Sequence, residues 1–289
     1  MDSLDDIRKK IETSINLYNT QPIEDFEGLS PADMRYVLYD PFSKDSPLRF
    51  KNNIPDKVLD QIPILNQVEY LLQKINDLGE IKLTSTGSLS TTIVKELYNQ
   101  GYIKDYAIEH GITKLYAETS CQSIHLTKII VELSGFVKKK NGKLSLTKTW
   151  KDKLISKNKR EILYQIFSVF SQKFNWSYFD GYPSQQTGQL GFAFSLYLIS
   201  KYGNVERLDS FYSGKYIKAF PKIQSDYNDD PFNKEGNREF HHCYSLRTFE
   251  RFLEYFNMTE SRTEGKLYLD SKIFIKKTAL FDKIISFEN

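Results

Sequence analysis

The sequence of 289 residues is long enough for two folded domains, since a domain usually contains about 100 to 150 residues. A hydrophobic content of 40% and a charged content of 27% exclude a disordered chain. The longest apolar run, residues 191–199, is too short to span a membrane, and two cysteines in unrelated contexts exclude a disulfide framework. The acidic start MDSLDD does not resemble a secretory signal, so we expect a soluble, cytoplasmic protein.

The net charge of +3 is unevenly distributed along the chain. Residues 1–60 carry 8 positive and 12 negative side chains, whereas residues 120–160 carry 11 positive and 2 negative ones. A local excess of nine positive charges is the strongest functional signal in the sequence, because clustered cations are typical of surfaces that bind anionic partners.

The first 60 residues are predicted to form an N-terminal helical segment. Residues 3–20 have apolar side chains at helical spacing, with Ser3 as the expected N-cap. A short helix is expected to begin at Pro31, because Ser30 can cap it and proline is favoured at the first helical position.

Residues 61–155 are predicted to form a winged-helix-like domain. Its expected elements are a helix over 63–78, a short strand at 81–84, a helix from Leu89 to Gly101 and a helix over 120–134 that directs Ile124, Ile129, Ile130 and Leu133 inward. The stretch GFVKKKNGKLSLTKT follows. It has two short runs of alternating apolar and polar residues on either side of Asn141-Gly142, and Asn-Gly is the dipeptide favoured in tight hairpin turns. Helix, strand, helix, helix and hairpin is the element order of a winged helix.

Residues 156–289 are predicted to form a helical region with a second winged-helix-like unit from about residue 185 onward. Helices are expected over 161–174, 188–203, 205–219 and 245–256, with a polar loop over 221–241. The motif Gly-Lys-Leu-x-Leu occurs at Gly142 and again at Gly265, each time shortly after a predicted helix. The fold class is therefore predicted to be mainly α with small β-hairpins, built from tandem winged-helix-like units.

Two stretches, LSPADMRYVLYDPF from Leu29 and KLTSTGSLSTTIVKELY from Lys82, resemble an uncharacterised bacterial family whose members recur beside SEC-C-motif and plasmid-borne open-reading-frame domains. The resemblance covers roughly residues 26–155. The matching positions are Leu29, Ser30, Pro31, Lys82, Leu83, Thr84, Gly87, Leu89, Gly135, Leu146 and Thr147. The resemblance implies a helical, winged-helix-like fold and supplies no activity and no catalytic residue.

The basic segment is the candidate nucleic-acid-binding site. A helix of this kind can enter a major groove while a lysine-rich hairpin neutralises phosphates, so double-stranded DNA is the first candidate partner. The candidate residues are Gln122, Ser123, His125, Lys128, Lys138, Lys139, Lys140 and Lys143. The alternative interpretation is a solvated lysine face on a scaffold that contacts a protein partner, because the segment contains almost no arginine, the usual base-reading cation.

Other signals favour structural roles. His241, His242 and Cys243 are adjacent, but their spacing matches no zinc pattern. Two triplets match the acid-x-lysine element of metal-dependent nucleases, namely Glu80-Ile81-Lys82 and Glu264-Gly265-Lys266. Such nucleases also need an upstream aspartate at the end of a core strand, and the sequence does not provide it. No metal site, cofactor or catalytic residue is predicted, and catalysis is the less favoured interpretation. The aromatic stretch 174–183 is predicted to lie where two halves of the chain pack, with a ligand groove as the alternative.

Overall fold

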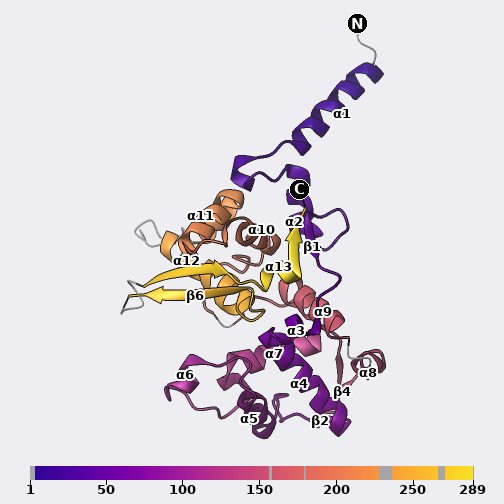
Figure 1. Cartoon of the computed structure of the whole chain (residues 1–289), viewed down its shortest axis with the longest axis vertical. Coiled ribbons are helices and arrows are strands. Elements are labelled where there is room, and N and C mark those ends of the chain that lie inside the picture. Colours follow the sequence, from indigo (N-terminus) through magenta and orange to yellow (C-terminus); the bar gives the residue numbers. More distant parts are fainter. Residues whose placement is uncertain (1–3, 156–157, 179, 228–235, 266–270, 289) are drawn as a thin grey trace. The chain divides into compact units, whose positions relative to one another are not determined.

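A computed structural model describes residues 4–155, 158–178, 180–227, 236–265 and 271–288, and it divides the chain into two units (Figure 1). Unit 1 comprises Met1–Asn52, Trp176–Leu253 and Met258–Asn289. Unit 2 comprises Asn53–Asn175 and Glu254–Asn257. The main segment of unit 2 is thus inserted between the first and second segments of unit 1, and its four-residue segment Glu254–Asn257 lies between the second and third.

Helices dominate both units. Unit 1 contains α1 Leu4–Thr20, η1 Glu24–Phe26, α2 Pro31–Tyr39, β1 Leu48–Phe50, α10 Phe192–Tyr202, β5 Arg207–Leu208, α11 Asp209–Ala219, η3 Pro221–Tyr227, α12 Gly236–Ser245, the π-helix η4 Leu246–Leu253, β6 Thr259–Glu264, β7 Lys272–Lys277, α13 Phe281–Ile284 and β8 Ile285–Phe287. Unit 2 contains α3 Asp56–Leu59, α4 Pro63–Leu78, β2 Ile81–Lys82, α5 Thr91–Asn99, α6 Tyr106–Glu109, η2 Glu118–Ser120, α7 Gln122–Leu133, β3 Val137–Lys140, β4 Lys143–Leu146, α8 Lys148–Ile155 and α9 Lys159–Gln172.

The core of unit 2 forms where α4 and α7 pack together. Helix α4 begins at Pro63, which needs no N–H partner there, and ends before Gly79, whose φ of +73° suits a residue without a Cβ. The two helices are also joined by polar contacts, because Gln67 donates to the Ser123 carbonyl at 3.1 Å and to the Thr127 hydroxyl at 2.7 Å. Buried amides need such partners, so this contact specifies how the helices align.

A three-stranded antiparallel sheet with the order β2-β4-β3 completes unit 2. Strands β3 and β4 are joined by Asn141 and Gly142, whose φ values of +51° and +69° match the left-handed tight turn that Asn-Gly favours. The predicted hairpin over residues 136–147 is therefore confirmed. Its second strand, β4, also pairs with the two-residue strand β2.

Unit 1 is built around α10, of which residues 192–199 are all buried. Its larger sheet has the order β5-β7-β6, so a two-residue strand again pairs with the second strand of a hairpin. A separate pair joins β1 to β8, with Arg49 opposite Ser286. Both sheets of unit 1 and the sheet of unit 2 are small and antiparallel, as predicted.

Three local predictions differ from the structure. Leu133 was expected to face inward, but it lies on the exposed face of α7. The expected helix over 245–256 is divided into the end of α12 and the π-helix η4. The polar loop expected over 221–241 instead contains η3, and α12 already begins at Gly236. Residues 266–269 of the second Gly-Lys-Leu-x-Leu motif lie outside the described residues, and the flanking strands β6 and β7 form an antiparallel pair.

Trp176 belongs to unit 1 and packs within it. Its ring lies 4.7 Å from that of Phe252 in η4, and its backbone N–H donates to the Gln189 side chain at 3.2 Å. The indole is buried, as the packing interpretation of the aromatic stretch requires. The predicted packing between two halves of the chain stays a prediction.

A fully buried ion pair connects the aromatic stretch to the π-helix. Arg247 donates to both carboxylate oxygens of Asp180, at 2.6 and 3.0 Å, and to the carbonyls of Ser184 and Thr187. Both side chains of the pair have 0% exposure. The guanidinium fork matches the carboxylate and leaves further N–H groups for the loop carbonyls, so one residue organises residues 180–187.

Glu27 joins the N-terminal segment of unit 1 to α10 and α11. Its carboxylate accepts hydrogen bonds from Lys215, at 2.5 Å, and from the Tyr202 hydroxyl, and its carbonyl accepts from Tyr197 and Lys201. Burial alone would raise the pKa of this carboxyl group. The hydrogen bonds from Lys215 and Tyr202 outweigh that effect and hold the pKa below its ordinary value of 4.5.

We expect the stability of unit 1 to fall as the pH falls through the lowered pKa of Glu27. Because the folded-state pKa is below the unfolded one, the contribution is complete above the ordinary value of 4.5 and is lost as the pH falls from there through the lowered pKa. Denaturant midpoints of the wild type should drop more steeply over this window than those of Glu27→Gln. Glu24→Gln, an exposed change in the same segment, should follow the wild type; if Glu27→Gln does too, this linkage is refuted.

Candidate functional site

Four lysines share the outer face of the unit 2 sheet. Directly paired residues on neighbouring antiparallel strands point to the same side, and Lys143 of β4 is paired with Lys140 on one side and Lys82 on the other. Lys138 lies on the same face two residues from Lys140 along β3. The opposite face carries the buried Ile81, Leu144 and Val137, so the core fixes which side the lysines occupy.

Lys139 alternates to the other face and reaches the turn before α5. Its Nζ would lie 2.8 Å from a Cβ built at Gly87, so only glycine at that position accommodates the ammonium group without displacement. The turn is ordered by its own bonds, among them Ser88 N–H to the Thr84 hydroxyl at 3.0 Å. Lys139 therefore extends the cationic surface from the hairpin to the hydroxyl-rich turn 84–88.

The arrangement of the lysines is electrostatically unfavourable in the free protein. Like charges directly opposite each other on paired strands are destabilising, and Lys143 has a lysine opposite it on both sides. Glu80 accepts a hydrogen bond from Lys143 and offsets part of this repulsion. Within the described residues, no carboxylate forms an ion pair with Lys82, Lys138, Lys139 or Lys140. These four charges are available to an external anion.

The corresponding hairpin of unit 1 shows the opposite electrostatic pattern. On the outer face of β6 and β7, Glu260 lies opposite Lys276 and Glu264 lies opposite Lys272. Between them, Arg262 forms ion pairs with Glu206 at 2.6 Å and with Glu264. This sheet neutralises its own cations, so the excess positive charge is a specific property of the unit 2 sheet.

The predicted residues of α7 divide into exposed and buried ones. Gln122 is exposed and His125 is half-buried, whereas Ser123 and Lys128 are buried. His125 Nδ1 lies 2.6 Å from the Glu118 carboxylate, whose side chain has 0% exposure, and Lys128 Nζ lies 3.9 Å from Glu118 and 3.5 Å from Glu132. The same carboxylate accepts the Leu89 N–H at 2.5 Å. Glu118 of η2 thus joins His125 and Lys128 of α7 to Leu89, which lies shortly before α5.

The remaining motifs take structural positions. Trp150 packs edge-on against Phe136 at 4.3 Å. His241, His242 and Cys243 lie on α12 and not in a strand; His241 Nδ1 lies 2.5 Å from the Ser213 hydroxyl, and Cys243 is buried. Over the described ranges, no three metal-binding side chains converge. Of the two acid-x-lysine motifs, the first holds Lys143 through Glu80, and Lys266 of the second lies outside the described residues.

A shallow hollow of about 360 Å³ lies beside the lysine face. It is lined by Glu80, Lys82 and Thr84 around β2 and by Ser90 and Ile93 at the start of α5. Ser90 caps α5 through the Ile93 N–H, so the polar groups at this edge are turned toward the helix start. The hollow is open to solvent and borders the lysine face at Lys82.

Lys82 is the residue that the sequence-based site omits. In the sequence it stands about 60 positions from the hairpin lysines, and β2 is only two residues long. The alternation Ile81-Lys82-Leu83 was the available signal, since both flanking apolar side chains are buried and Lys82 is exposed.

Comparison of the chain with protein-family models, with curated proteins and with solved structures found no match. No helix in the described part of the chain is long and apolar enough to cross a membrane.

Proposed function

We propose that unit 2 is a winged helix that binds double-stranded DNA through the lysine face of its sheet, defined here as Lys82, Lys138, Lys140 and Lys143 with Lys139 at its edge. The fold assignment is supported by the order α4, β2, α5, α6, η2, α7, β3, β4, in which helices lie between the first strand and the hairpin and the first strand pairs with the last. Unit 1 has the similar order α10, β5, α11, η3, α12, η4, β6, β7, again with the first strand paired with the last, which supports a tandem arrangement of two such folds.

The observation that carries the proposal is the row of lysines without carboxylate partners. Duplex DNA carries one negative charge per about 1.7 Å of its axis, so a rigid face with several ammonium groups can neutralise several phosphates at once. Bound phosphates also relieve the repulsion between Lys82, Lys143 and Lys140, which the free protein tolerates. The sheet of unit 1 serves as an internal comparison, because its ion pairs leave no such row.

The recognition is directed mainly at the phosphate backbone. Lysine binds phosphate as a point charge, whereas base discrimination usually relies on arginine, asparagine or glutamine aimed at base edges. On the uncovered face of α7, Gln122 is the exposed side chain with this capacity, and Ile129, Glu132 and Leu133 follow it. We therefore infer a binding mode with a weak preference for base sequence.

Affinity for a DNA duplex measured over a series of salt concentrations tests the proposal. Each neutralised phosphate contributes about −0.9 to the slope of log K against log salt, so the four lysines without a carboxylate partner in the described residues predict a slope of about −3.6. Fluorescence anisotropy with a labelled duplex would give this slope directly. A wild-type protein that does not bind DNA at about 50 mM salt, where the electrostatic attraction is strong, contradicts the proposed function.

A second candidate, a scaffold that contacts protein, is favoured by one observation. None of the residues of α1 is buried, although several of them are large and apolar. An exposed apolar surface of this size marks an interaction site in soluble proteins.

A further inference from the structure

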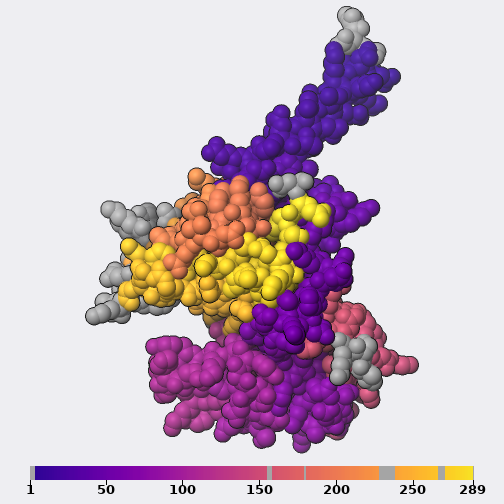
Figure 2. Space-filling view, in the orientation of Figure 1, coloured from indigo at the N-terminus to yellow at the C-terminus, as the bar shows by residue number. Residues whose placement is uncertain are grey.

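Helix α1 presents an apolar stripe that no described part of the chain covers. Figure 2 shows its indigo atoms exposed along the helix on the side in view. The stripe consists of Leu4, Ile7, Ile11, Ile15 and Tyr18, and each of these side chains is between 43% and 82% exposed. The helix is 17 residues long, or about 25 Å.

A partner is needed to explain why α1 is a helix. Isolated helices shorter than about 12 to 15 residues are marginal in water even when they are rich in alanine, and α1 is only slightly longer and contains no alanine. It contains three isoleucines and several Thr and Asn residues, which have lower helix propensity. Most helical stability in proteins comes from burying an apolar face, and within the described chain this face is not buried.

The spacing of the stripe is symmetric about Ile11. Ile7 and Ile15 lie four residues to either side, and Leu4 and Tyr18 lie seven residues to either side. This pattern suits two antiparallel helices related by a two-fold axis that passes between them at Ile11. The axis places each residue of one helix opposite the residue of the other copy that lies equally far on the other side of Ile11. Such an axis brings Ile11 against its own copy, Ile7 against Ile15, and Leu4 against Tyr18.

We propose that α1 is a self-association element that pairs in an antiparallel orientation with α1 of a second copy of this chain. Charge complementarity supports this occupant: Arg8 and Glu12 flank the same edge of the stripe on either side of Ile11, so antiparallel pairing brings each Arg8 near Glu12 of the second copy. Within the described residues, neither Arg8 nor Glu12 forms an ion pair. Antiparallel alignment also opposes the two helix dipoles.

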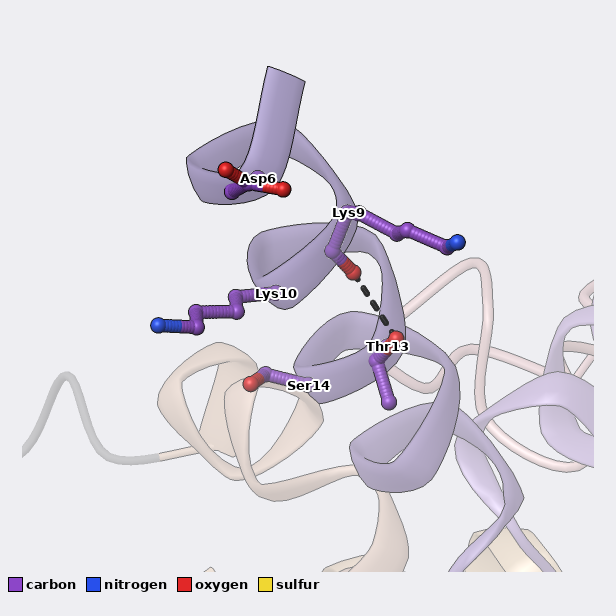
Figure 3. A pocket seen from close by; sticks show the side chains of 5 residues that line it. All are labelled: Asp6, Lys9, Lys10, Thr13 and Ser14. Atoms are coloured by element: carbon purple, nitrogen blue, oxygen red, sulfur yellow. Dashed lines mark hydrogen bonds between the residues drawn. The ribbon is translucent and has the colours of Figure 1, made fainter. Parts of the chain in front are cut away.

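The flank away from the stripe is polar and suited to solvent. Figure 3 shows Lys9 and Lys10 extending away from the helix in different directions, with Asp6, Thr13 and Ser14 on the neighbouring turns. The Thr13 hydroxyl donates to the Lys9 carbonyl at 2.8 Å within the same helix. With one polar flank and one symmetric apolar stripe, α1 fits a two-helix interface better than a fully buried position.

Sedimentation equilibrium of the full chain tests the association. We expect the apparent mass to rise with concentration from 33.8 kDa toward twice that value, and Ile11→Asp to abolish the rise, because the substitution places two carboxylates at the two-fold axis. Ile112→Asp is the matched control: it changes another isoleucine that is exposed in unit 2, and it should leave self-association unchanged. Since Ile11 is exposed in the single chain, both variants should remain folded.

The orientation is tested by oxidative cross-linking of introduced cysteines. The two native cysteines are both buried, so we expect them not to cross-link. Leu4→Cys combined with Tyr18→Cys should give a covalent dimer, whereas Leu4→Cys alone should not, because residue 4 meets residue 18 of the second copy. A wild-type chain that stays monomeric up to about 100 µM, or an Ile11→Asp variant that still dimerises, would overturn the proposal. Cross-linking by Leu4→Cys alone would overturn the antiparallel arrangement.

Discussion

Replacing Lys82, Lys138 and Lys140 together with Gln is expected to weaken binding of a DNA duplex about 10³-fold at 50 mM salt. The three side chains are exposed on one face of the sheet, and each lost phosphate contact removes about 0.9 from the salt slope. The slope should therefore fall by about 2.7, and the difference from wild type should shrink as salt increases. The measurement is duplex affinity by fluorescence anisotropy at several salt concentrations.

The matched control removes three cations from the outer face of the other sheet. Arg262, Lys272 and Lys276 lie on the paired strands β6 and β7, and two of them belong to ion pairs with Glu206, Glu260 or Glu264. Their replacement with Gln changes the net charge equally and should alter affinity far less. Equal losses in the two triple variants would show a diffuse charge effect and remove the unit 2 sheet as the binding face. Exposed lysines contribute little to stability, so circular dichroism should show both variants folded.

Arg247→Met is expected to destabilise the protein by about 3 to 5 kcal/mol. The substitution removes the closer of two guanidinium groups that face the buried Asp180 carboxylate and leaves Arg251, whose Nη1 lies 3.8 Å away, as a weaker partner. It also removes the donors that satisfy the carbonyls of Ser184 and Thr187. Breaking one side of a buried pair costs more than the pair itself contributes, because the remaining charge keeps its desolvation penalty. Chemical denaturation of the wild type and the variant gives the difference.

A double-variant cycle separates this mechanism from a simple loss of packing. Adding Asp180→Leu to Arg247→Met removes the stranded charge and should recover a large part of the lost stability. If the double variant is less stable than Arg247→Met by the full cost of Asp180→Leu alone, the two side chains act independently and the ion pair does not explain the effect.

The lysine hairpin could be predicted from the sequence because its determinants are local. Asn141-Gly142 sets the turn, and the turn sets the register that pairs Lys140 with Lys143. The place of Lys82 could not be predicted in the same way. A two-residue strand has no pattern of its own, and its partner is chosen by the burial of Ile81 against the core of unit 2.

Helix α7 shows where helical periodicity is insufficient. Ser123 and Lys128 are polar, so their positions in the sequence favour a surface role, but both are buried. For Lys128 the reason is Glu118, a buried carboxylate four residues before the helix begins, which attracts the ammonium group and also accepts from Leu89. Ser123 instead lies beside Cys121, with 3.3 Å between its hydroxyl and the Cys121 sulfur. Leu133 is the converse case: it follows the apolar spacing and is exposed. A nearby buried charge changes which polar residues a helix can bury, and the periodicity of the helix does not contain that information.

The pairing of β1 with β8 determines the order in which the chain can fold during synthesis. Arg49 is paired in the sheet with Ser286 and its side chain forms an ion pair with Glu288, 239 positions later. Every element of unit 2 from α3 to α9 is translated between these two strands. Contacts so distant in sequence form slowly, and domains tend to fold as they leave the ribosome. The nascent chain should therefore hold β1 as an open strand edge while most of unit 2 already folds. Strand β1 therefore lacks its partner in the sheet until β8 has been translated.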